Sequence, residues 1–152
     1  MKPKYRNLPL ALILIGYAVY GVVFIQQSLF VVDGQLYAAL FDDAMISMSY
    51  ARSLAQGSGL VWYPGAARVE GFSNPMWVGF MALIHLLPLP EGLVSLPVMA
   101  TGALFMLGCL FFLYKIAERL FSGRLLPTLL TVFLAAFYYP LSNWSLLGTE
   151  VS

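Results

Sequence analysis

The chain has 152 residues, of which 61% are hydrophobic and only 10% are charged, and its mean hydropathy is +0.82. Globular domains carry about 25% charged residues, so this composition predicts an integral membrane protein. The net charge of +1 excludes the extended basic surface that nucleic-acid binding requires. With a single cysteine, Cys109, no disulfide can form within one copy of the chain.

The first predicted element is a membrane span over residues 8–32. This uncharged run follows Lys2, Lys4 and Arg6, and as a helix its 25 residues would extend about 38 Å, beyond the ~30 Å hydrocarbon core. The apolar region of a signal peptide has only about 7 to 15 residues. We therefore expect an uncleaved anchor with its N-terminus in the cytoplasm, because basic residues favour the cytoplasmic side.

Residues 33–91 are expected to form a loop outside the cytoplasm. They include a predicted amphipathic helix over about 43–56, with Asp42 as a good N-cap and Gly57 as a natural residue just past the C-terminus. Asp43 would suit the dipole of the first helical turn. The predicted polar side carries Ser49, Arg52, Ser53 and Gln56, and the predicted apolar side carries Ile46, Tyr50, Ala51, Leu54 and Ala55.

The remaining apolar runs predict two more spans and one helix along the membrane surface. Residues 92–114 and 125–144 are long enough to cross the bilayer, whereas 75–87 would extend only about 20 Å as a helix. If 75–87 lies along the interface, the basic turn 115–124 is cytoplasmic, which satisfies the positive-inside rule. We thus expect an all-α, multi-pass protein of the plasma membrane, with the loop 33–91 on the non-cytoplasmic side.

Two adjacent carboxylates, Asp42 and Asp43, stand beside the first predicted span. They could serve the N-terminus of a helix, or one could act as a general base. One histidine, His85, and one cysteine in separate segments are too few ligands for zinc, and His85 is interpreted as a hydrogen-bonded interfacial residue. Asp42, Asp43 and Glu70 offer oxygen ligands for Mg²⁺ or Ca²⁺, but three ligands are too few to assign a divalent cation, so no cofactor is predicted.

A series of motifs in this loop resembles the first outer loop of the GT-C superfamily of membrane glycosyltransferases. The likeness is greatest to the mycobacterial arabinofuranosyltransferase B-like branch. Gly148-Thr149-Glu150-Val151 also resembles the Gly-x-Glu-Thr element that begins the second outer loop of that branch, but differs in its last residue. The motifs in the first loop are Asp42-Asp43-Ala44, Ile46-Ser47, Tyr50-Ala51-Arg52, Leu54-Ala55, Gly57, Gly59-Leu60, Pro64-Gly65, Val69-Glu70-Gly71-Phe72-Ser73-Asn74-Pro75 and Trp77.

The resemblance implies the N-terminal portion of an inverting glycosyltransferase, inactive on its own. The complete enzyme would transfer a sugar from a polyprenyl-phosphate donor to a glycan, lipid or protein acceptor of the cell envelope. Asp42 would be the general base, with Asp43 beside it in the catalytic pair. The substrate-binding residues that follow are Arg52 or Arg68 for the departing phosphate, Glu70 and Asn74 for sugar hydroxyls, Trp77 as a sugar platform, and Glu150 from the second motif.

Other interpretations of the same residues remain open. Arg52 could pair with Glu70 or Asp43 at the surface of the loop, and Trp77 could be an interfacial anchor. A different class of function is a non-catalytic membrane subunit or anchor, whose loop binds a lipid head group or a protein partner. The two classes differ in whether the acidic pair performs chemistry.

Overall fold

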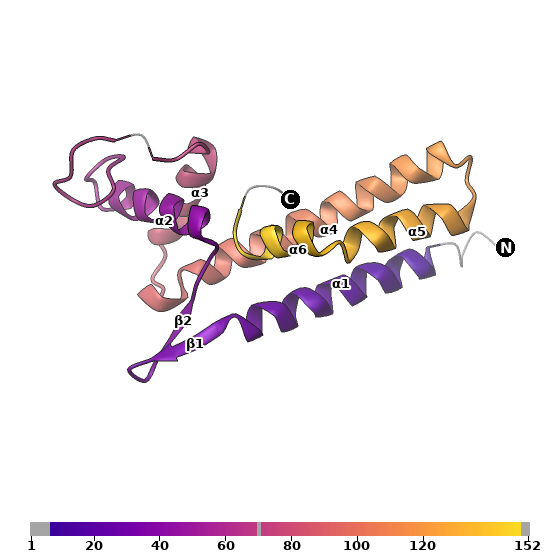
Figure 1. Ribbon diagram of the computed structural model, residues 1–152, viewed down its shortest axis with the longest axis horizontal. Coiled ribbons are helices and arrows are strands. Elements are labelled where there is room, and N and C mark those ends of the chain that lie inside the picture. The colour runs from indigo at the N-terminus through magenta and orange to yellow at the C-terminus, as the bar shows by residue number, and fades with distance from the viewer. Residues whose placement is uncertain (1–6, 70, 150–152) are drawn as a thin grey trace.

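The computed structural model describes residues 7–69 and 71–149, and these are mostly helical. Four helices lie side by side as a bundle, and two more pack together at one end of it (Figure 1). The turn between the fourth and fifth helices lies at the opposite end. The bundle comprises α1 (Leu8–Gln27), α4 (Ser95–Leu120), α5 (Leu125–Ala136) and α6 (Tyr139–Leu146); α2 (Asp42–Ala55) and α3 (Pro75–His85) form the end, with the hairpin β1 (Leu29–Val32) and β2 (Gln35–Ala38) and the 3₁₀ turn η2 (Glu91–Leu93).

Within residues 7–69 and 71–149, two helical stretches are long and apolar enough to cross a membrane. They are α1 and the stretch Glu91–Leu120, in which η2 leads into α4. A third candidate exists if α5 and α6, which are bent by 52° at their junction, count as one span. Pro140 in the first turn of α6 lacks the N–H that a continuous helix would need. The predicted helical class is confirmed, and the structure offers two or three candidate spans where the sequence predicts three.

The predicted helix over 8–32 is wrong in its last part. Helix α1 ends at Gln27, and Leu29–Val32 instead forms a strand that pairs antiparallel with Gln35–Ala38. Between the strands, Asp33 and Gly34 have φ values of +50° and +76°. A two-residue type I′ turn requires positive φ at both positions, and Asp-Gly is a favoured pair for it. The apolar run is therefore shared between a helix and a β-hairpin.

Helix α2 begins one residue earlier than predicted and is capped differently. Phe41 occupies the N-cap position and Asp42 is the first helical residue, so the predicted N-cap role of Asp42 is wrong. The predicted end is confirmed at Gly57, which has a φ of +78°. Its N–H donates to the carbonyl oxygen of Leu54, and the N–H of Ser58 donates to that of Ser53, both at 3.0 Å. These two bonds form the Schellman motif, which satisfies the last carbonyls of a helix.

The predicted sides of α2 are correct for some residues and wrong for others. Tyr50 and Ala51 are buried and Arg52 is exposed, as expected. Ser53, predicted on the polar side, is only 2% exposed, whereas Leu54, predicted on the apolar side, is 37% exposed. Burial therefore follows the helix faces that contact α3 and the following loop, rather than the polarity of each side chain.

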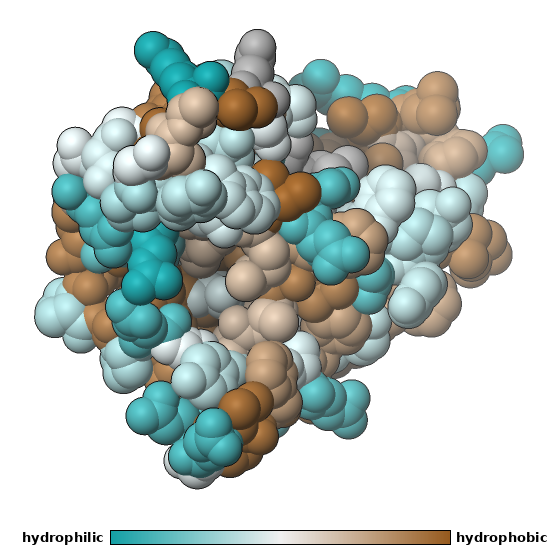
Figure 2. Space-filling view, turned by 60° about the vertical axis from the view of Figure 1, so that its left-hand side comes forward, coloured by the Kyte–Doolittle hydropathy of each residue, from teal (hydrophilic) through white to brown (hydrophobic). Residues whose placement is uncertain are grey.

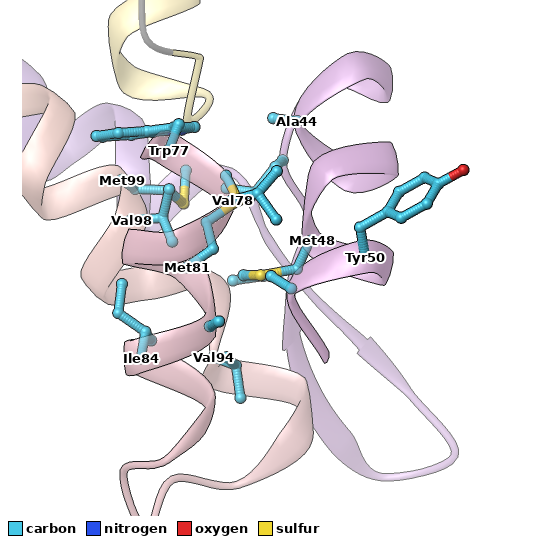
Figure 3. Packing of buried hydrophobic residues seen from close by; sticks show 14 residues of the cluster. Ala44, Met48, Tyr50, Trp77, Val78, Met81, Ile84, Val94, Val98 and Met99 are labelled. Atoms are coloured by element: carbon cyan, nitrogen blue, oxygen red, sulfur yellow. The ribbon is translucent and has the colours of Figure 1, made fainter. Parts of the chain in front are cut away.

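The main core lies where α3 sits between α2 and α4 (Figure 3). Val78 and Met81 of α3 are completely buried against Met48 of α2 and Met99 of α4. Figure 3 shows that Tyr50 points away from this cluster. Its ring packs on Phe72 at a centroid distance of 4.9 Å, and its hydroxyl donates to the carbonyl oxygen of Val69 at 2.9 Å. Tyr50 therefore ties the loop after α2 to the helix.

Candidate functional site

A cleft of about 310 Å³ opens beside the N-terminus of α2. Figure 2 turns this end of the molecule forward and shows hydrophilic and hydrophobic residues mixed over it. Three stretches far apart in the sequence form the cleft: the start of α2, the loop before α3, and the end of α6 with the residues after it. Its lining residues are Phe41, Asp43, Ile46, Ser47, Gly71, Phe72, Ser73, Asn74, Trp144 and Thr149.

Hydrogen bonds hold the three stretches of the cleft together. The hydroxyl of Ser47 in α2 donates to Oδ1 of Asn74 at 3.0 Å, which joins α2 to the loop before α3. The N–H of Phe41 donates to the carbonyl oxygen of Leu147 at 3.0 Å, which joins the start of α2 to the end of α6. The hydroxyl of Thr149 donates to the carbonyl oxygen of Trp144 at 2.9 Å. The polar groups of the cleft are therefore positioned by the fold.

The lining combines one carboxylate, several neutral polar groups and three aromatic rings. Asp43 is exposed in the first turn of α2, where a negative charge complements the helix dipole. Ligand sites commonly pair apolar walls with a few polar groups that fix orientation. Phe41, Phe72 and Trp144 provide the apolar walls here. The cleft thus suits a small ligand that has both apolar faces and hydroxyl groups.

The structure separates the predicted site residues of α2. Asp43 lines the cleft, and Asp42 is exposed outside its lining. Arg52 follows Asp43 by nine residues, which is a rotation of about 180° and a rise of about 13.5 Å along the helix. Its Nη2 lies 2.9 Å from Oε1 of Glu91. The alternative in which Arg52 pairs with Asp43 is therefore wrong. Glu70, the other possible partner of Arg52, lies outside the described residues.

The other predicted binding residues have different positions. Asn74 lines the cleft, whereas Arg68 borders a neighbouring cavity that shares Phe72 with it. Trp77 is only 9% exposed, and its indole N–H donates to the carbonyl oxygen of Gly148 at 2.9 Å. A buried indole is not accessible as a surface anchor or as a sugar platform, and it holds Gly148, the neighbour of the lining residue Thr149. Glu150 falls outside the described part of the chain.

The three aromatic lining residues were not predicted to bind a ligand. Trp144 is exposed together with Tyr138 and Tyr139, as aromatic residues are where a span leaves the bilayer. In the sequence, Phe41 directly precedes the acidic pair, and Phe72 lies two residues before Asn74. This closeness to predicted site residues is the signal that could have identified them. Across residues 7–69 and 71–149, no cluster of three or more His, Cys, Asp or Glu side chains is placed to hold a metal ion.

No family model, curated protein or solved structure matches this chain.

Proposed function

We propose that the chain forms the donor-side part of an inverting membrane glycosyltransferase that uses a polyprenyl-phosphate sugar. One observation carries this proposal. The stretches that bear the GT-C-like motifs, Asp42-Asp43, Gly71–Asn74 and Gly148-Thr149, are separated by up to about a hundred residues and meet at one cleft. Motifs that were unrelated to one another would have no reason to converge on a single site.

The size of the cleft agrees with a sugar head group. Its volume of about 310 Å³ lies at the lower end of the range of roughly 300 to 1,000 Å³ for small-molecule sites. A polyprenyl tail is far larger and would remain against the apolar helices that flank the cleft. The hydroxyl of Ser73 and the amide of Asn74 would orient the sugar hydroxyls, and the ring of Trp144 would pack against the sugar.

In this proposal the base comes from the acidic pair. The resemblance pointed to Asp42, but Asp43 is the carboxylate that lines the cleft, and we assign the base to Asp43 for that reason. It would take the proton from an acceptor hydroxyl as that oxygen attacks the anomeric carbon. The lipid phosphate would leave from the opposite face, which inverts the configuration. Arg68 lines a cavity that shares Phe72 with the cleft, whereas the cavities lined by Arg52 share no residue with it, so Arg68 would bind the departing phosphate.

The proposal includes a location in the plasma membrane with the cleft on the non-cytoplasmic side. In support, Arg119 in the last turn of α4 and Arg124 at the N-cap of α5 flank the turn at the end of the bundle opposite α2 and α3 (Figure 1). Basic turns favour the cytoplasm, so the acidic end would face outward. The acceptor would be a glycan, lipid or protein of the cell envelope, which is accessible from that side.

The test measures transfer of labelled sugar from a polyprenyl-phosphate donor in membranes that contain the full-length natural protein. Asp43→Asn should lower the rate by roughly 10² to 10⁴, the usual contribution of a general base. Asp42→Asn should cost less, because Asp42 lies outside the cleft lining.

The reverse order of losses would move the base to Asp42. Unchanged transfer in both variants would refute catalysis by this pair. Transfer that is absent from the wild-type membranes themselves, together with tight binding of the donor, would favour the non-catalytic subunit that binds a lipid head group.

A further inference from the structure

A second polar site lies on the face of α2 opposite the cleft. A cavity of about 270 Å³ there is bordered by Arg52, His85 and Glu91, together with Leu87 and Leu89. An adjoining cavity of about 180 Å³ shares the same three polar residues and extends toward β2. We call these two cavities, which meet at Arg52, His85 and Glu91, the Arg52 recess.

The rim of the Arg52 recess carries one positive and one negative charge side by side. The Arg52 and Glu91 side chains are 52% and 82% exposed and form their ion pair at 2.9 Å. Exposed ion pairs contribute little to stability. A ligand can therefore replace Glu91 as the partner of Arg52, and Arg52 as the partner of Glu91, at a small cost in free energy. A guanidinium has five N–H donors, so Arg52 can bind an anion while Glu91 binds a cation.

His85 adds a hydrogen-bond acceptor to the recess. Burial, reinforced by the nearby charge of Arg52, lowers the pKa of His85, while a hydrogen bond to the backbone of Met48 and the charge of Glu91 oppose this shift. The ring is therefore neutral at neutral pH, and one of its nitrogens is an acceptor. Its Nε2 is buried and has no hydrogen-bond partner within residues 7–69 and 71–149. A donor that enters the cavities beside the ring would supply the missing partner.

Apolar side chains surround the polar groups of the recess. Leu87 and Leu89 are 51% and 37% exposed, and they border the same cavity as Arg52 and Glu91. They directly precede the stretch Glu91–Leu120, which is apolar enough to span a membrane. The recess therefore pairs charged groups with apolar surface at the level where that stretch begins.

We propose that the Arg52 recess binds the head group of a zwitterionic phospholipid that carries a primary ammonium. Its phosphate would bind Arg52, its ammonium would bind Glu91 and Nε2 of His85, and its acyl chains would lie against Leu87 and Leu89. A ligand with a single charge would engage only one of the two charged groups, Arg52 or Glu91. This site is independent of the proposed glycosyl transfer, because the recess and the Asp43 cleft lie on opposite faces of α2.

The test uses the full-length protein in detergent and short-chain phospholipids with identical acyl chains. Phosphatidylethanolamine should bind more tightly than phosphatidylcholine, which has no ammonium N–H, and more tightly than phosphatidylglycerol, which has no ammonium, by roughly tenfold in dissociation constant. Free phosphoethanolamine, which has no acyl chains, should bind more weakly than the lipid. Equal binding of the three lipids would overturn the proposal, and free phosphoethanolamine as tight as the lipid would overturn the assignment to a phospholipid.

Two pairs of variants locate the site. Glu91→Gln and Arg52→Gln should each abolish the preference for phosphatidylethanolamine over phosphatidylcholine. Asp33→Asn, in the hairpin turn, and Arg124→Gln, at the far end of the bundle, remove the same charges elsewhere and should keep the preference. If Arg52→Gln does not fold, Glu91→Gln carries the test, since its side chain is mostly exposed. A preference that persists in Glu91→Gln would overturn the proposal.

Discussion

The indole nitrogen of Trp77 donates a buried hydrogen bond of 2.9 Å to the carbonyl oxygen of Gly148, 71 residues further along the chain. Gly148 has a φ of +85°, a region that glycine enters without steric cost. A Cβ atom at this position would also meet the side chains of Leu40 and Val98. This one hydrogen bond thus attaches the segment after α6, which forms one wall of the cleft, to the buried side of α3.

Trp77→Phe tests the importance of this bond for stability. The substitution keeps an aromatic ring but leaves the carbonyl of Gly148 buried without its donor, which should lower the free energy of unfolding by about 1 to 3 kcal/mol. Chemical unfolding in mild detergent measures the change. Trp62→Phe is the matched control, because Trp62 is 45% exposed and should change stability by much less. Equal effects of the two substitutions would show that ring volume, rather than the hydrogen bond, is what matters.

Two glycines of α4 predict opposite outcomes for the same substitution. A Cβ atom at Gly102 would overlap the carbonyl oxygen of Ser145 in α6, whereas a Cβ atom at Gly108 would meet nothing. Gly102→Ala should therefore destabilise the protein by about 1 to 3 kcal/mol through overpacking. Gly108→Ala should stabilise α4 by up to about 1 kcal/mol through helix propensity. Thermal unfolding of both variants checks the pair, and a neutral Gly102→Ala would contradict the close contact between α4 and α6.

The partly buried imidazole of His85 predicts a pH dependence of stability. Its pKa in the folded protein is lowered from the usual value of 6.5. As the pH falls, the unfolded chain takes up a proton at this residue before the folded protein does. The contribution to stability is therefore fully present above the usual pKa of 6.5 and decreases as the pH falls below it.

Unfolding at a series of pH values, compared with His85→Gln, isolates the contribution of this residue. The difference in stability between wild type and variant should shrink as the solution becomes more acidic. A difference that grows toward low pH would mean that folding raises the pKa instead.

The sidedness of the chain is tested with single cysteines. Ser58, Glu91 and Gly123 are all exposed, and Cys109, which is also exposed, is first replaced. An impermeant thiol reagent applied to intact cells should label cysteines at positions 58 and 91 and should leave position 123 unlabelled, because the basic turn favours the cytoplasm. Labelling at 123 but not at 91 would reverse the assigned orientation.

The helical parts of the fold were largely predictable from the sequence. Apolar length and turn residues placed α2 and α3 within about two residues of their observed ends. Leu29–Val32 was missed because the whole run 8–32 is uncharged, although the polar residues Gln26, Gln27 and Ser28 mark the point where the helix ends. The Asp33-Gly34 pair between strand-forming residues is a hairpin signal, and it could have corrected the prediction.

The site was predictable only in part, because its geometry depends on contacts between distant segments. Helical periodicity puts Asp43 and Arg52 on opposite faces, and this could have been calculated from their spacing. The pairing of Arg52 with Glu91 could not have been calculated in this way, because it depends on how η2 folds back toward α2. Tryptophan is a typical residue of the membrane–water interface. Only the packing of α3 between α2 and α4 reveals that Trp77 is buried.

The walls of the cleft come from segments far apart in the sequence, so the cleft can be completed only late in synthesis. Helices α2 and α3 are neighbours in the chain and can pack as soon as both have left the ribosome. The wall formed by Trp144 and Thr149 is synthesised about a hundred residues after Asp43, and contacts of such separation form slowly. A ribosome that pauses at the end of α5 would therefore hold a nascent chain in which α2 and α3 can already pack, while Trp144 and Thr149 have not yet been synthesised.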